Sequence, residues 1–224
     1  MAYFTQDYLN FFRDLSENNH REWFHANKKR YENSVKKPFA AFVDALIERV
    51  QDEDDPEIQI TAKEAIFRIN RDIRFSKDKT PYKNHMSAVV SRGGRKEMTR
   101  PGLYVQLNHE HLQIYGGLYM LDKQQLQRVR THISDHLPEF KELLANSSFA
   151  EKFDGLHGEK NKRLPKEFQE AAEEQPLLYN KSYYHFVHLP AAHIPQDDLI
   201  DVIMDYHLAA RPMRHFLTEA IGAE

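Results

Sequence analysis

The sequence predicts an α+β fold: a single domain in which an antiparallel meander sheet packs with N-terminal and C-terminal helices. Apolar residues recur at helical spacing in the first 50 residues and again after residue 120. Between these regions, short runs alternate apolar and polar residues, which is typical of half-buried strands. The links between these runs are short, and short links favour antiparallel neighbours. Helices on either side of a block of strands indicate the α+β class.

The first 50 residues are predicted to be helical. Thr5 is placed to cap a first helix, and Asn19 with Glu22 three residues later resembles a capping box for a second one. Pro38 suits the start of a further helix. This last helix carries an apolar stripe that we expect in the core, made of Phe39, Phe42, Val43, Leu46, Ile47 and Val50.

The acidic run at residues 52–56 is predicted to be an exposed loop after that helix. A calcium site is the alternative interpretation, but the run lacks the ligand spacing and the glycine of an EF-hand loop. We therefore expect solvated carboxylates here and no bound cation.

The centre of the chain is predicted to form the sheet. The clearest strands are residues 86–91, 103–107, 112–115 and 183–189. Residues 108–111 are predicted to be the turn between the second and the third of them.

The run from Phe67 to Phe75 also alternates, which predicts a strand with Ile69 and Ile73 on its apolar side. Arg71 falls on that same side. Because an unpaired buried charge costs several kcal/mol, we expect Arg71 to have a carboxylate partner, and Glu22 is our candidate.

Helices return after the sheet, one beginning near Asp122 and the last at residues 195–198. Two histidine pairs raise the question of a metal: His132 with His136, and His109 with His111. A metal also needs a third and a fourth ligand at defined places, so we predict no metal site. The residues that we expect to be buried are Phe39, Phe42, Leu46, Ile69, Ile73, Val105 and Ile133.

Charge is unevenly distributed along the chain. The net charge is −3, but residues 62–100 hold 11 Lys and Arg against 4 Asp and Glu, a net of +7. The remainder therefore has a net charge of −10. A basic patch on an otherwise acidic chain favours a localised anionic ligand over broad coating of nucleic acid.

The stretch FRINRDIRFSKDKTPYK at residues 67–83 resembles the signature of the domain of unknown function 2461 family. Asn18 to Tyr31, Gly93-Gly94, Gly116-Gly117 and the run LPKEF at residues 164–168 resemble its other landmarks. In the last of these, Glu167 stands where the family pattern has glycine. The resemblance implies one domain over residues 1–224 and no established activity.

The same stretch is the candidate ligand site. The residues that we expect to bind an anion are Arg68, Arg71, Arg74, Lys77, Lys79, Thr80, Tyr82 and Lys83. Guanidinium forks and ammonium groups suit phosphate or carboxylate, and we expect five of these cations to converge on one cleft, namely Arg68, Arg74, Lys77, Lys79 and Lys83. Tyr82 and Trp23 are candidates for a face on which a base stacks. Asp72 and Asp78 are the only acid–base candidates nearby, so catalytic residues stay unassigned.

Three functions stay open. The first is a basic cleft that binds a phosphate-like anion such as a nucleotide or a sugar phosphate. The second is a nucleic-acid or polyanion binding module without catalysis, and the third is a structural or interaction protein whose Arg–Asp lattice is scaffold. No Walker loop, dinucleotide fingerprint, nucleophile elbow or zincin motif occurs, so enzymatic activity is left open and the cofactor unknown.

The cysteine-free sequence excludes disulfides and thiol nucleophiles and suits a reducing cytosol. No apolar run approaches the ~20 residues of a membrane span, and the N-terminus lacks the pattern of a signal peptide. We therefore expect a cytoplasmic protein without a membrane partner, and the oligomeric state is not predicted.

Overall fold

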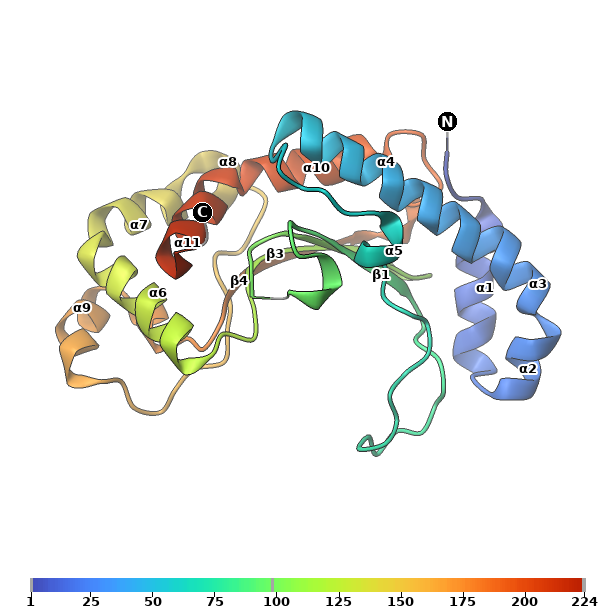
Figure 1. The fold of residues 1–224 in the computed structure, drawn as a ribbon, viewed down its shortest axis with the longest axis horizontal. Helices are drawn as coiled ribbons and strands as arrows, with labels where there is room; N and C mark the ends of the chain where they lie inside the picture. The colour runs from blue at the N-terminus through green and yellow to red at the C-terminus, as the bar shows by residue number, and fades with distance from the viewer. Residues whose placement is uncertain (1, 98, 223–224) are drawn as a thin grey trace.

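The structure confirms the α+β class. The computed structural model of this chain describes residues 2–97 and 99–222. Helices α4 and α10 lie over one face of a central sheet, and further helices are grouped at its two ends (Figure 1). In the described part of the chain, the opposite face of the sheet carries no α-helix, and we call it the open face.

The long helices fall where the apolar periodicity places them, and the short helices α5, α8 and α9 were not predicted. Those before the sheet are α1 (Gln6–Glu17), α2 (Arg21–Ala26), α3 (Lys28–Arg30), the π-helix η1 (Tyr31–Lys36), α4 (Lys37–Glu53) and α5 (Ala62–Ala65). Those after it are α6 (Lys123–Asp135), α7 (Leu137–Ala145), α8 (Ser147–Ala150), α9 (Gln169–Glu174), α10 (Leu199–Ala209) and α11 (Arg211–Ile221). Four short 3-10 turns complete them: η2 (Gly94–Lys96), η3 (Lys166–Phe168), η4 (Pro176–Tyr179) and η5 (Ala191–His193).

The sheet is an antiparallel meander of four strands in the order β1-β2-β3-β4. Its strands are β1 (Met86–Val90), β2 (Leu103–Leu107), β3 (His111–Leu118) and β4 (Tyr183–Pro190). Along β2, Leu103, Val105 and Leu107 are buried, while the alternate Tyr104 and Gln106 are half-buried. The pleat therefore directs the aliphatic residues toward α4 and α10 and the alternate polar and aromatic residues toward the open face.

The hydrophobic core consists of two clusters. One packs α1, α4 and α10 on the sheet, and the other lies among α6, α7 and α11. Val187 and Tyr206 pack against both clusters, so the two parts are continuous. Of the seven residues expected to be buried, Phe39, Phe42, Leu46, Ile69, Val105 and Ile133 are buried, and Ile73 is only half-buried.

The prediction of a strand from Phe67 to Phe75 is wrong. The segment makes only isolated bridges, Ile66 with Ala88 and Asn70 with Tyr82. It leaves the body of the protein and returns, and we call residues 67–83 the basic arm (Figure 1). Phe75, placed on the apolar side by alternation, is 94% exposed because the arm has no layer packed against its far end.

Two local expectations also need correction. The capping residue of α2 is His20, whose ring accepts the Trp23 N–H, and Asn19 has another partner described below. In the acidic loop, the Asp54 side chain is only 4% exposed because Arg211, Arg214 and His207 surround it.

Candidate functional site

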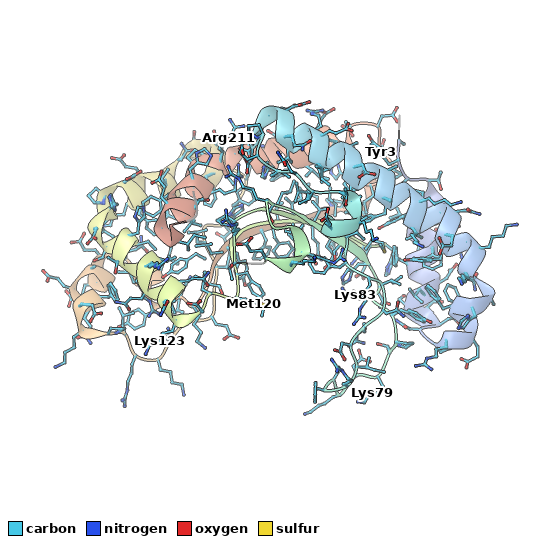
Figure 2. The ribbon with its side chains drawn as sticks, viewed as in Figure 1. Tyr3, Lys79, Lys83, Met120, Lys123 and Arg211 are labelled. Atoms are coloured by element: carbon cyan, nitrogen blue, oxygen red, sulfur yellow. The ribbon has the colours of Figure 1, made fainter. Side chains whose placement is uncertain are left out.

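The basic arm is anchored at its base and open at its far end. The Phe67 N–H donates to the Ser87 carbonyl at 2.9 Å, which attaches the outgoing limb to β1. The two limbs then pair through the Lys83 N–H and the Ile69 carbonyl at 2.8 Å. Lys83 lies at the base of the arm, close to the sheet, whereas Lys79 lies near its far end (Figure 2).

Ionic groups at the far end of the arm are paired with one another. Arg71 donates to the Asp78 carboxylate and to the Thr80 hydroxyl. Arg74 bonds the Asp72 carboxylate at 2.7 Å, and the Lys79 ammonium donates to a backbone carbonyl at 2.9 Å. Arg71 therefore has the carboxylate partner expected of it, but the proposed partner Glu22 was wrong, since Glu22 pairs with His20.

Both carboxylates of the arm are held in the ionised form. The Thr80 backbone N–H, followed by Arg71, lowers the pKa of Asp78 to about 2. The Arg74 side chain lowers the pKa of Asp72 below its ordinary value. At neutral pH these two groups therefore orient arginine side chains, and neither holds a proton to donate.

The two aromatic residues predicted to stack on a ligand lie against other aromatic rings of the protein. The Tyr82 ring is stacked on Phe24 with centroids 4.0 Å apart, and Tyr82 is 6% exposed. The Trp23 ring packs on Phe11 at 5.6 Å. The Tyr82 ring therefore fixes the base of the arm to α2. Lys77, by contrast, is exposed.

At the base of the arm lie two neighbouring cations, Arg68 and Lys83. Within the described residues, neither has a carboxylate within salt-bridge distance. The Lys83 ammonium lies 5.2 Å from the centre of the Phe67 ring. Burial, and then the nearby charge of Arg68, lower the pKa of Lys83 below its ordinary value. These two cations therefore repel each other. The carboxylate that Arg68 acts on is Asp72, which forms its salt bridge with Arg74 instead.

Two cavities meet at this point. Phe67 and Lys83 line both of them. The larger, about 910 Å³, lies between the arm and α2, η1, α4 and α5, and Arg68 and Asp72 are among its walls. The smaller, about 450 Å³, lies on the open face of the sheet under Tyr104, Tyr115 and Tyr184. Among the described residues that line the smaller cavity, Lys83 and Arg100 are cations and none is Asp or Glu.

The rings of the open face form a continuous row that the sequence reasoning missed. Its members are Phe67, Tyr104, Tyr115, Phe186 and His157, with successive centroids 6.0, 5.7, 5.4 and 4.7 Å apart. We call these five residues the aromatic row. The sheet register produces it, because Tyr104 pairs with Tyr115 and Tyr115 with Phe186 on adjacent strands. A row of half-exposed rings is a surface on which planar groups can stack.

Amides beside the row provide hydrogen-bonding groups. The Tyr104 hydroxyl donates to Gln106 at 3.0 Å, and the Gln106 amide donates to Gln113 at 2.8 Å. The Tyr115 hydroxyl lies 2.8 Å from His188 Nε2. The open face therefore combines aromatic surface with neutral polar groups, while its cations lie at one edge.

A metal site and a membrane-spanning helix each place requirements on the described residues. No three His, Asp or Glu side chains within residues 2–97 and 99–222 are placed to hold a metal ion. In the same residues, no helix combines the length and apolar character needed to cross a bilayer.

The fold and the site define an α+β protein that leaves an aromatic sheet face open beside a basic arm. The chain belongs to the family described as "Conserved hypothetical protein (DUF2461)", whose model matches residues 7–216. This match confirms the resemblance found in the sequence. No curated protein matches the chain.

Proposed function

We propose that this protein binds a phosphate-bearing aromatic ligand of the nucleotide class at the base of the basic arm. The observation that carries the proposal is the pair Arg68 and Lys83, two neighbouring cations with no carboxylate partner among the described residues. A phosphate between them would supply a direct counter-charge and accept charge-assisted hydrogen bonds from both.

The aromatic cavity next to Lys83 supports an aromatic group in the same ligand. Tyr104 and Tyr115 present ring surface there, and a base stacked on a protein ring contributes roughly 1–3 kcal/mol. Gly116 and Gly117 also line this cavity, so the ligand can approach bare backbone. A sugar phosphate or inorganic phosphate would use the cations but leave the rings without a partner.

The other cations of the arm have different roles in this proposal. Arg71, Arg74 and Thr80 use their donors within the arm, which sets its shape. Lys77 and Lys79 contribute to the positive field that attracts an anion toward the base. The proposal describes binding and assigns no reaction to Asp72 or Asp78. A cytoplasmic location, favoured by the cysteine-free sequence, belongs to the same proposal.

Isothermal titration calorimetry with UMP, AMP, ribose 5-phosphate and inorganic phosphate tests it. We expect a nucleotide to bind more tightly than the two ligands without a base. Lys83→Met and Arg68→Met keep most of the apolar stem of the side chain and remove its charge, and each should weaken binding by at least tenfold. Lys77→Met is the matched control and should bind within twofold of wild type, since Lys77 lies outside both cavities. Normal nucleotide binding by Lys83→Met would contradict the proposal.

A further inference from the structure

The aromatic row extends well beyond the cavity proposed for one nucleotide. We propose that the ligand is a single-stranded nucleic acid that lies across the open face, perpendicular to the strands, from the basic arm to the segment after His157. This inference rests on the proposed function and extends it from a mononucleotide to a polymer.

The row has rings on three of the four strands of the sheet, β2, β3 and β4. Val89, Tyr104, Tyr115 and Phe186 occupy one register position on β1 to β4. Beyond β4, His157 continues the line, because its backbone pairs with Tyr184 through hydrogen bonds of 2.7 and 3.1 Å. At about 4.8 Å per strand the line spans roughly 20 Å, which suits on the order of four nucleotides. One base in the cavity would cover Tyr104 and Tyr115 and leave Phe186 and His157 without a ligand.

A second group of cations follows His157 along the chain, in the segment that pairs with the residues just before β4. Lys160, Lys162 and Arg163 are exposed, and no carboxylate within residues 2–97 and 99–222 pairs with them. The segment that leads into α9 descends on the same side of the sheet as the basic arm (Figure 1). Arg68 and Lys83 at one end and these three cations at the other fit a ligand with several phosphates spaced along its length.

The neutral side chains between the two ends favour single strands over duplex. Gln106, Gln113 and His188 offer amide and imidazole groups beside the rings, and such groups bond the edges of unpaired bases. In a duplex the bases are stacked on one another, so the aromatic row would have no base to contact. A polyphosphate or a sulfated polysaccharide would satisfy the cations without using the rings.

Fluorescence anisotropy with labelled oligo-U and oligo-dT of 2, 4, 8 and 12 nucleotides, together with the UMP titration above, tests the inference. We expect affinity to rise steeply up to about four to eight nucleotides and to fall with added salt. Phe186→Ala should weaken binding of the 8-mer roughly 5- to 100-fold, which is the loss of one stacked base. Replacing Lys160, Lys162 and Arg163 together by alanine should weaken the 8-mer, lower its salt dependence and leave UMP binding unchanged.

The control removes three exposed cations elsewhere: Lys28, Lys29 and Lys37 to alanine. This variant has the same net charge as the test variant and should bind the 8-mer as wild type does. Equal affinity for UMP and the 8-mer would overturn the inference that the ligand is a polymer. It would leave the proposed function standing. If neither binds, both proposals are wrong. If the 8-mer binds Phe186→Ala normally and polyphosphate competes equally well, the stacking arrangement is overturned.

Discussion

Asn19 and Tyr82 are joined by a reciprocal pair of hydrogen bonds. The Asn19 Nδ2 donates to the Tyr82 carbonyl at 3.0 Å, and the Tyr82 N–H donates to Asn19 Oδ1 at 3.1 Å. The Asn19 amide thus makes the two backbone hydrogen bonds that a neighbouring strand would otherwise make with Tyr82, in the returning limb of the arm. Because Lys83 follows directly, this pairing fixes the position of the cation on which the proposed function depends.

Asn19→Ala should therefore loosen the base of the arm. The Tyr82 backbone groups would lose both partners, at a cost of about 1–3 kcal/mol in the free energy of unfolding. Hydrogen exchange should show faster exchange of the Tyr82 amide. Asn84→Ala is the control, because Asn84 contacts the same Asn19 amide at 2.9 Å but makes none of the Tyr82 bonds. If the Tyr82 amide proton exchanges at the same rate in Asn19→Ala as in wild type, the two Asn19–Tyr82 hydrogen bonds do not hold the base of the arm.

Gly117 is expected to tolerate no side chain. Its φ is +101°, and an added Cβ would lie 2.3 Å from the Tyr183 carbonyl of the paired strand. Gly117→Ala should lower the free energy of unfolding by roughly 2 kcal/mol or more. Gly155 has φ +77° and open space around a Cβ, so Gly155→Ala should cost only about 1 kcal/mol. Urea denaturation of both variants measures this difference, and equal costs would contradict the steric explanation.

The buried carboxylate of Asp54 connects the end of α4 to α10 and α11. It bonds Arg211 at 2.7 Å and lies 2.8 Å from His207 Nε2, and Arg214 is its third partner. Asp54→Ala would leave the mostly buried Arg214 without its counter-charge and should destabilise the protein by about 3–5 kcal/mol. The neighbouring exposed Asp52 is the control. The free energy of unfolding of Asp52→Ala should lie within about 0.5 kcal/mol of that of wild type. A small effect of Asp54→Ala would mean that water replaces the carboxylate.

Stability should fall on mild acidification because two histidines are buried in the neutral form. Burial, together with Arg214, lowers the pKa of His207 to about 4 and that of His185 to about 3. An unfolded histidine titrates near 6.5, so below that pH the unfolded chain binds more protons than the folded one. The stability that these groups contribute is complete above pH 6.5 and is lost progressively toward pH 4. Between pH 7 and pH 5 we expect a loss on the order of 2 kcal/mol per histidine.

Urea denaturation at pH 7 and pH 5 measures this effect, with His207→Gln as the comparison. The variant should show a smaller difference between the two pH values than wild type does. Equal stability of wild type at pH 7 and pH 5 would contradict the neutral assignment of both histidines.

Local pattern was sufficient to predict the sheet but not the arm. Residues 103–107 were predicted to be a strand, and β2 is Leu103–Leu107, because its alternation reflects one buried and one half-exposed face. The run from Phe67 to Phe75 alternates as clearly, but its one bridge is Asn70 with Tyr82. No described part of the chain packs against the far end of the arm, where Phe75 is exposed. An alternating sequence indicates on which side of an extended chain each residue lies. Whether that side is buried depends on whether another part of the protein packs against it. The partners of Asp54 lie more than 150 residues away, where no local signal reaches.

The candidate site was predicted in part for the same reason. The charge count drew attention to residues 67–83, yet it could not separate the self-paired Arg71 and Arg74 from the unpaired Arg68 and Lys83. The aromatic row did leave a signal, since Tyr104 and Tyr115 alternate with aliphatic residues in two strands. The sequence does not say which face of the sheet the helices leave uncovered, because that depends on tertiary packing.

The central claim is that the ligand binds where Lys83 meets the aromatic cavity. A titration of 15N-labelled protein with UMP, followed by NMR, locates the contact residue by residue. The account predicts that the largest amide shifts cluster at Lys83, Tyr104, Tyr115 and Gly116-Gly117 and that they disappear in Lys83→Met. Shifts confined to the far end of the arm around Lys77, or to helices distant from the open face, would contradict it.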